Sequence, residues 1–148
     1  HRDTHCFPTR RYSDREAMVV KGVGGLEEMS TSGGNKAKRL NGGEIETKGL
    51  RRREFGLRHG KTTGGIVSSP AESVGVFVDV LKGGDSGAAT DMVLVNAAAA
   101  IVVAGLEKEL VDGVERARES LSTGAAEGKL RQLIKATKGD DSRLDRLQ

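Results

Sequence analysis

Two adjacent carboxylates in a glycine-rich loop are the residues of this sequence best suited to chemistry. Glu27 and Glu28 follow the stretch Lys-Gly-Val-Gly-Gly at residues 21–25. Mg²⁺ is a hard cation that binds one or two protein carboxylates together with several waters and substrate phosphate oxygens. The pair is therefore a candidate magnesium site. The alternative is that Glu27 and Glu28 are ordinary exposed acids at the end of a loop.

Other short motifs point toward phosphate or cofactor chemistry, but each lacks a defining residue. Residues 60–65 contain Gly-Lys-Thr without the glycine five positions earlier that a phosphate-binding loop has, so a flexible surface loop is expected. Gly22 and Gly24 lack the third glycine of a dinucleotide fingerprint. The run Arg51–Arg53 is the densest positive charge in the chain, and it is either a phosphate contact or a solvated turn.

The first fourteen residues share no pattern with the rest of the chain. Residues 1–14 have neither helical nor strand periodicity and resemble the translation of a sequencing adapter, so we interpret them as a non-native leader. His1, His5 and Cys6 match no closed zinc spacing. Cys6 is the only cysteine and forms no internal disulfide, which suits a reducing cytoplasm.

Composition favours one globular domain without a nucleic-acid or membrane partner. The 148 residues are 36% hydrophobic and 30% charged, with 24 Lys and Arg against 21 Asp and Glu. Aromatic residues are only 3%, which leaves few stacking surfaces for single-stranded nucleic acid. The longest apolar run, residues 92–105, is shorter than the ~20 residues of a membrane span, and no secretory signal is recognisable. We therefore expect a cytoplasmic protein.

The elements expected to position the acid pair are three strands. Residues 17–20 are β-branched or apolar and predict a buried strand that leads into the glycine-rich loop. Residues 35–40 and 44–50 flank Asn41-Gly42-Gly43, and an Asn-Gly pair tolerates the positive φ angles of a tight hairpin. Two antiparallel strands are the expected result.

Two helices are expected after the hairpin. In Ser-Pro-Ala-Glu at residues 69–72, Ser69 caps a helix, proline takes its first position and Glu72 completes a capping box. This helix is expected to end near Lys82, with four apolar residues on its buried face: Val74, Phe77, Val78 and Leu81. A second helix over residues 89–104 is apolar nearly all round and is expected to be central.

The C-terminal part of the chain predicts two more helices and a polar tail. Apolar residues recur every three or four positions from Leu106 to Leu121, which indicates an amphipathic surface helix. Gly124 ends this pattern, and a final helix is expected to end near Gly139. Residues 140–148 are polar and are expected to fray.

Four segments, in order and with suitable gaps, resemble anthranilate phosphoribosyltransferases. They are Ala-Met-Val-Val (17–20), Gly-Gly-Leu-Glu-Glu-Met-Ser (24–30), Glu-Phe-Gly-Leu (54–57) and Asp-Met-Val-Leu-Val-Asn-Ala-Ala-Ala-Ala (91–100). The resemblance spans about residues 15–137 and implies that residues 15–139 are the C-terminal part of that family's α/β domain. The implied fold class is α/β, a partial sheet with a β-hairpin and about four packed helices.

The resemblance also implies an activity. Enzymes of this family act in tryptophan biosynthesis, use phosphoribosyl pyrophosphate and anthranilate as substrates with Mg²⁺ as cofactor, and form homodimers. Their acidic motif resembles Asp-Gly-Leu-Asp-Glu, and residues 24–28 here read Gly-Gly-Leu-Glu-Glu, so the implied metal ligands are Glu27 and Glu28. Asn96 matches a family asparagine and is either a buried amide that pairs with neighbouring backbone or a substrate contact.

Several departures from the family pattern bear on activity. Glu27 stands where the family has aspartate, Lys21 where it has histidine, and Val67-Ser68-Ser69 where it has Gly-Gly-Asp. The family's loop for the phosphoribosyl substrate lies N-terminal to everything present here, so we expect negligible turnover from this chain alone. The alternatives are a non-catalytic domain of the same fold that acts as a binding or assembly module, and a small basic nucleic-acid binder.

Overall fold

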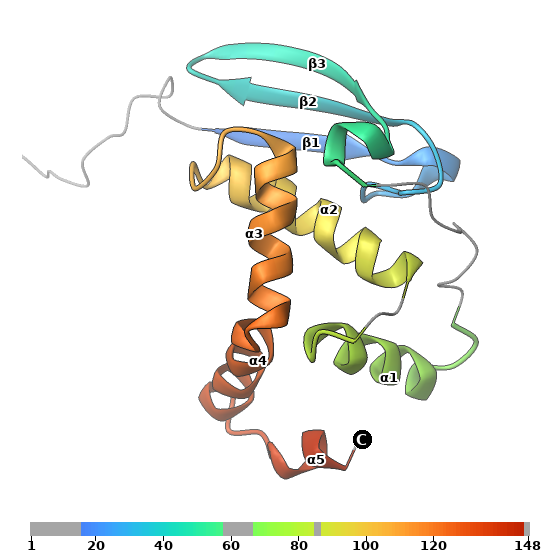
Figure 1. The fold of residues 1–148 in the computed structure, drawn as a ribbon, viewed down its shortest axis with the longest axis vertical. Coiled ribbons are helices and arrows are strands. Elements are labelled where there is room, and N and C mark those ends of the chain that lie inside the picture. The colour runs from blue at the N-terminus through green and yellow to red at the C-terminus, as the bar shows by residue number, and fades with distance from the viewer. Residues whose placement is uncertain (1–15, 58–66, 85–86, 147–148) are drawn as a thin grey trace, which may run out of the picture.

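The computed structural model describes residues 16–57, 67–84 and 87–146, and it has one sheet and a group of helices (Figure 1). The strands are β1 (Ala17–Lys21), β2 (Asn35–Asn41) and β3 (Glu44–Leu50). The helices are α1 (Pro70–Leu81), α2 (Ala88–Val103), α3 (Leu110–Ser122), α4 (Ala125–Ala136) and α5 (Ser142–Asp145), with 3-10 turns η2 (Val23–Gly25) and η3 (Arg52–Phe55). The α/β class is confirmed.

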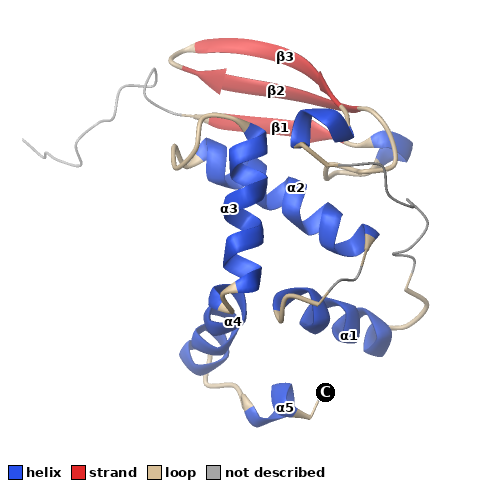
Figure 2. Cartoon of the chain, viewed as in Figure 1, coloured by secondary structure: helices blue, strands red, loops and turns tan. Residues whose placement is uncertain are grey.

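The sheet forms one layer and the helices lie on one side of it (Figure 2). Helices α2 and α3 lie next to the sheet, whereas α1, α4 and α5 lie farther from it (Figure 1). None of the described helices combines the length and the apolar character that crossing a bilayer requires. The interpretations of the leader and of the loop at residues 60–65 concern segments outside the described residues.

The predicted hairpin between β2 and β3 is confirmed, with its turn one residue later than the Asn-Gly pair suggested. Asn41 and Glu44 are the last paired residues of the two strands, so the loop consists of the two residues between them. Gly42 and Gly43 both have positive φ, 57° and 89°. Two successive positive φ values are what a two-residue hairpin turn needs to follow the twist of its strands.

Strand β1 is present as predicted, but the expectation that it is buried is wrong. It pairs with β2 only and lies at an edge of the antiparallel order β1-β2-β3 of the described sheet. Ala17, Val19 and Lys21 are exposed, and the alternate residues Met18 and Val20 are half-buried. The helices cover a single face of this sheet, and a strand covered on one face alternates between buried and exposed side chains.

Helix α2 is central, as its nearly uniform apolar character predicted. Four of its residues are buried: Leu94, Val95, Ala98 and Val102. The core around three of them also includes Met29 from the loop after β1, Phe55 from η3 and Val114 from α3. The helix therefore connects the sheet and the loop that carries the acid pair with the helical layer.

Helix α1 begins where its capping signal predicts, with one difference in the capping box. The hydroxyl of Ser69 accepts a hydrogen bond from the backbone N–H of Glu72 at 3.2 Å. The Glu72 carboxylate accepts from both the backbone N–H and the hydroxyl of Ser68, each at 2.8 Å. In an ideal capping box it would instead accept from the backbone N–H of the cap residue, Ser69. The two bonds from Ser68 hold the pKa of the Glu72 carboxyl below its ordinary value.

The buried face of α1 differs from the predicted one. Val78 and Val80 are each 2% exposed, and Leu81 is half-buried, whereas Val74 and Phe77 are 45% and 51% exposed. Apolar residues lie on most of the circumference of this helix, so spacing alone did not identify the side that meets α2.

Substituting Ser69 is expected to destabilise α1 measurably. Ser69→Ala removes the side-chain acceptor of the Glu72 N–H, and loss of such a cap costs about 1 kcal/mol. Urea unfolding followed by circular dichroism measures this cost. Ser73→Ala in the same helix is the control, expected within a few tenths of a kcal/mol of the original chain; equal midpoints for the two variants would contradict the assignment of the cap.

Helix α3 is amphipathic as predicted but starts later than expected. Leu106 lies outside it and is 54% exposed, and the helix begins at Leu110. Gly105 has a φ of 70° and terminates the preceding helix α2 in a left-handed conformation. Val114, Ala117 and Leu121 form the buried stripe of α3, together with Gly113.

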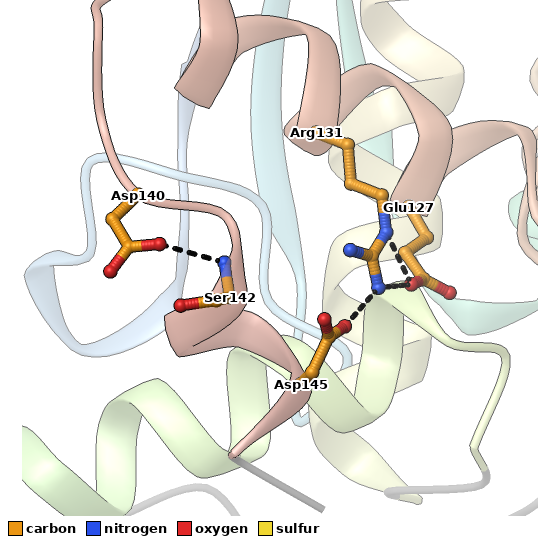
Figure 3. Close-up of polar contacts among 5 residues, drawn as sticks. All are labelled: Glu127, Arg131, Asp140, Ser142 and Asp145. Atoms are coloured by element: carbon orange, nitrogen blue, oxygen red, sulfur yellow. Dashed lines mark hydrogen bonds and ion pairs between the residues drawn. The ribbon is translucent and has the colours of Figure 1, made fainter.

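The expectation that the polar tail frays is wrong for residues 140–146, which contain helix α5. Leu144 is 5% exposed, and the guanidinium of Arg131 on α4 lies between the carboxylates of Glu127 and Asp145, 2.8 Å from each (Figure 3). The hydrogen bonds to these two carboxylates raise the pKa of Arg131 above its already high ordinary value, and the bond to Asp145 contributes most. One buried leucine and one shared arginine therefore fix this short helix.

Candidate functional site

The loop that carries the acid pair, residues 22–31, folds back on itself directly after β1. The N–H of Gly22 donates to the carbonyl of Leu26 at 2.8 Å. Gly24 and Gly25 have φ values of 73° and 85°, a region that glycine enters without the steric penalty of a Cβ. As a result Glu27 and Glu28 are exposed at the end of the loop, while Met29, directly after them, is fully buried.

Gly22 is the point at which the loop closes on its own backbone. A Cβ on this residue would lie 2.3 Å from the carbonyl oxygen of Glu28 and 3.0 Å from the Cβ of Leu26. No side chain fits in that space, so the position of Glu28 depends on glycine at residue 22. In the sequence, Gly22 is part of a glycine-rich stretch, and nothing in that stretch distinguishes it from its neighbours.

The side-chain amide of Asn96 forms hydrogen bonds with both backbone groups of Met29, the residue after the acid pair. Its Oδ1 accepts from the N–H of Met29 at 2.9 Å, and its Nδ2 donates to the carbonyl of Met29 at 2.9 Å. The same Nδ2 donates to the carbonyl of Met92, one turn earlier in α2, at 2.9 Å. The predicted pairing of Asn96 with neighbouring backbone is confirmed, but its side chain is half-buried rather than buried.

A second asparagine, Asn35 at the start of β2, holds the other side of the loop. Its Oδ1 accepts from the N–H of Ser30 at 2.7 Å, and its Nδ2 donates to the carbonyls of Ser30 at 2.9 Å and Leu50 at 3.2 Å. Asn35 is 2% exposed and Ser30 is 4% exposed. This role is not predictable from the sequence, in which Asn35 is simply the first residue of an expected strand.

The three consecutive arginines divide between two surroundings: Arg51 and Arg53 line a hollow that Lys36 also lines, whereas Arg52 contacts α2. Arg52 forms an ion pair with Asp91 of α2 at 2.7 Å and donates to the carbonyl of Thr31 at 3.5 Å. Arg53 pairs with its neighbour Glu54 at 2.6 Å and lowers the pKa of that carboxyl. Arg52 therefore has a structural role near the acid loop that the sequence did not reveal, and a phosphate contact at the other two arginines stays a prediction.

Glu28 lies at the edge of a groove of about 590 Å³ formed mainly by α1 and α2. The groove is predominantly apolar, and its other lining residues are Val67, Ser73, Val76, Phe77, Val80, Leu81, Ala88, Ala89, Met92, Val93, Asn96 and Ala97. Glu27 is exposed and is not part of this lining. The two adjacent acids therefore face different surroundings, and only Glu28 borders the groove.

Glu27 and Glu28 would give a metal ion few protein ligands. Within residues 16–57, 67–84 and 87–146, no three His, Cys, Asp or Glu side chains gather closely enough to hold a metal. A site built on Glu27 and Glu28 thus offers at most two carboxylates. Mg²⁺ is commonly bound in this way, with waters and substrate phosphate oxygens completing its octahedron.

Two of the departures from the family pattern have local consequences. Lys21 is exposed at the end of β1 and has no ion pair within the described part of the chain. In the other segment Val67 lines the groove, and Ser68 and Ser69 both bond to Glu72 at the start of α1. The serines therefore stabilise a helix end at the position where the family has Gly-Gly-Asp.

Comparison with known proteins agrees with the resemblance read from the sequence. The family model described as "Glycosyl transferase family, a/b domain" matches residues 9–127. The anthranilate phosphoribosyltransferase of Nitrosomonas europaea is 39% identical over 124 residues, which cover 84% of this chain and 36% of that protein. The corresponding enzyme of Acidovorax sp. (strain JS42) is 38% identical over 128 residues, 86% of this chain and 37% of that protein.

Solved structures give the same result. The anthranilate phosphoribosyltransferase of Saccharomyces cerevisiae in complex with PRPP and Mg matches with a TM-score of 0.72 and 25% identity, over 83% of this chain and 35% of that one. The enzyme of Thermus thermophilus matches with a TM-score of 0.67 and 29% identity, over 80% of this chain and 35% of that one. The chain thus spans little more than a third of the length of the relatives it matches.

Proposed function

Because the chain belongs to the glycosyl transferase family, as part of its α/β domain, we propose that it is part of an anthranilate phosphoribosyltransferase. In the whole enzyme the amine nitrogen of anthranilate forms a bond to C1 of the ribose of phosphoribosyl pyrophosphate. The bond from C1 to the pyrophosphate oxygen breaks, pyrophosphate leaves with the bonding electron pair, and the nitrogen releases one of its protons. The position of Glu28 at the edge of the groove, beside a backbone held by Asn96, is the observation that supports this function most directly.

The acid loop is proposed to bind the magnesium ion of this reaction. When bound, Mg²⁺ neutralises the negative charge that accumulates on the departing pyrophosphate. Glu28 supplies the main carboxylate and Glu27 the second one. The close approach of Gly22 and the hydrogen bonds from Asn96 fix the backbone that carries them. The lining of the groove, including the exposed side chains of Phe77 and Val93, places an apolar surface beside Glu28.

The substrates, the homodimer and the cytoplasmic location remain predictions. The relatives named above are anthranilate phosphoribosyltransferases, and one of them is described with PRPP and Mg. This supports phosphoribosyl pyrophosphate and anthranilate as the substrates of the whole protein from which this chain comes.

Neutralising either acid is expected to weaken divalent-cation binding. Mn²⁺ serves as a paramagnetic probe for Mg²⁺, and its free concentration is measured by electron paramagnetic resonance in the presence of pyrophosphate. Glu28→Gln removes the charge of the ligand that borders the groove, and the affinity for Mn²⁺ is expected to fall at least about tenfold. Glu27→Gln is expected to have a smaller effect in the same direction.

Glu44→Gln is the matched control, since Glu44 is an exposed acid at the hairpin turn, and it should bind Mn²⁺ like the original chain. The proposal fails if the original chain shows no saturable binding, or if the Glu28→Gln and Glu44→Gln variants bind equally well.

A further inference from the structure

We propose that Asn96 is a positioning residue, which sets the metal affinity of the acid pair by fixing the backbone next to Glu28. The inference rests on the proposed function, and it assigns to Asn96 a role that involves no contact with metal or substrate. It follows from the hydrogen-bonding capacity of the amide, from its place on α2 and from a second connection between the same loop and the same helix.

The amide of Asn96 has no donor left for a ligand. An asparagine side chain has two N–H donors and one carbonyl acceptor. Both donors are used, by the carbonyls of Met29 and Met92, and the acceptor receives the N–H of Met29. The orientation of the amide is forced, since only its oxygen can pair with a backbone N–H. Although Asn96 lines the groove, it therefore acts through the backbone of Met29.

Because Asn96 lies on α2, its hydrogen bonds fix the acid loop to a helix with few exposed residues. Met29 is fully buried, and Val95, the neighbour of Asn96, is also 0% exposed. Glu28 directly precedes Met29, so a shift of the Met29 backbone would move the Glu28 carboxylate by a similar distance. A displacement of about 1 Å is enough to disturb a site of this kind.

A second connection joins the same loop to α2. Arg52 contacts the carbonyl of Thr31 at 3.5 Å and the carboxylate of Asp91 at 2.7 Å. Met29 and Thr31 are two residues apart on the loop, and Asn96 and Asp91 are five apart on the helix. Two such connections restrict both translation and rotation of the loop, and Asn96 is the nearer of the two to the acids.

Asn96→Ala tests this role by three measurements on the full chain. Mn²⁺ affinity in the presence of pyrophosphate is expected to fall about 10–100-fold, the range seen when a group that orients a metal ligand is lost. Hydrogen exchange of the Glu28 and Met29 amides is expected to accelerate, while the β2 amides remain protected. Urea unfolding establishes that the variant is folded at the temperature of the binding measurement.

Asn41→Ala is the matched control, because Asn41 is an exposed asparagine at the end of β2, and it is expected to change neither Mn²⁺ affinity nor loop exchange. If the folded Asn96→Ala variant binds Mn²⁺ like the original chain, Asn96 is structural only and the inference is overturned.

Further variants keep the test decisive if Asn96→Ala does not fold. Asn96→Asp keeps an acceptor for the Met29 N–H but replaces the donor to the Met29 carbonyl with an oxygen that repels it. Asp91→Asn weakens the second connection only. Both are expected to lower Mn²⁺ affinity, Asp91→Asn by less, and unchanged affinity in both overturns the inference.

Failure of the proposed function has a separate signature. If the original chain binds no Mn²⁺, the metal site itself is wrong, and hydrogen exchange in the Asn96 variants alone decides whether the amide positions the loop. Unchanged exchange at Glu28 and Met29 then overturns the positioning role as well.

Discussion

Gly22→Ala is expected to abolish saturable Mn²⁺ binding and to lower the free energy of unfolding by about 1–3 kcal/mol, the usual cost of overpacking. The added Cβ would lie 2.3 Å from the carbonyl oxygen of Glu28. That oxygen belongs to the backbone and cannot rotate away as a flexible side chain does, so the chain at Glu28 must shift. The shift weakens the hydrogen bond from the Gly22 N–H to the Leu26 carbonyl and the two hydrogen bonds between Met29 and Asn96.

Gly34→Ala is the matched control for this substitution. Gly34 lies between the same two strands, a Cβ there would meet no atom within 4 Å, and its φ is not among the positive values. It is expected to bind Mn²⁺ normally and to unfold within about 0.5 kcal/mol of the original chain. Titration with Mn²⁺ and urea unfolding measure both effects, and a Gly22→Ala variant that binds like Gly34→Ala would show that the loop does not depend on this contact.

Local signals in the sequence predicted most of the fold, because the structures concerned are set by a few neighbouring residues. The cap at Ser69 and the turn at Gly42-Gly43 each depend on backbone geometry within four residues. The start of α3 was placed wrongly because Leu106 continues the apolar spacing although Gly105 has already turned the chain.

Properties that depend on distant contacts were less predictable. The periodicity of α1 allowed more than one buried face, and packing against α2 buries Val80 and leaves Phe77 exposed. The tail was read as frayed because its residues are polar, yet the fixed position of α5 depends on Leu144 and on Arg131, which lies 14 residues before Asp145.

The candidate site shows the same division. The acid pair was recognisable from residue type and loop composition, and Asn96 was correctly predicted to pair with backbone because it is a single amide in an apolar helix. The partner of that amide, Met29, lies 67 residues earlier, and the ion pair of Arg52 with Asp91 spans 39 residues. No spacing rule connects residues so far apart.

The crossing of α2 and α3 provides the second large expected effect. Gly113 is buried on α3, and a Cβ there would lie 3.0 Å from the carbonyl oxygen of Ala98 and 3.1 Å from both its Cα and Cβ. Alanine favours a helix over glycine by about 1 kcal/mol, whereas overpacking of a core costs about 1–3 kcal/mol. Gly113→Ala is therefore expected to separate the helices slightly and to lower the free energy of unfolding by about 1–2 kcal/mol net.

Gly128→Ala separates the two contributions, because Gly128 is also inside a helix, α4, but a Cβ there would meet no atom within 4 Å. Only the helix preference then changes, and this variant is expected to gain about 0.5–1 kcal/mol. Urea midpoints should therefore move in opposite directions for the two glycines. If Gly113→Ala stabilises the chain as Gly128→Ala does, α2 and α3 do not meet as closely at Ala98 as the structure indicates.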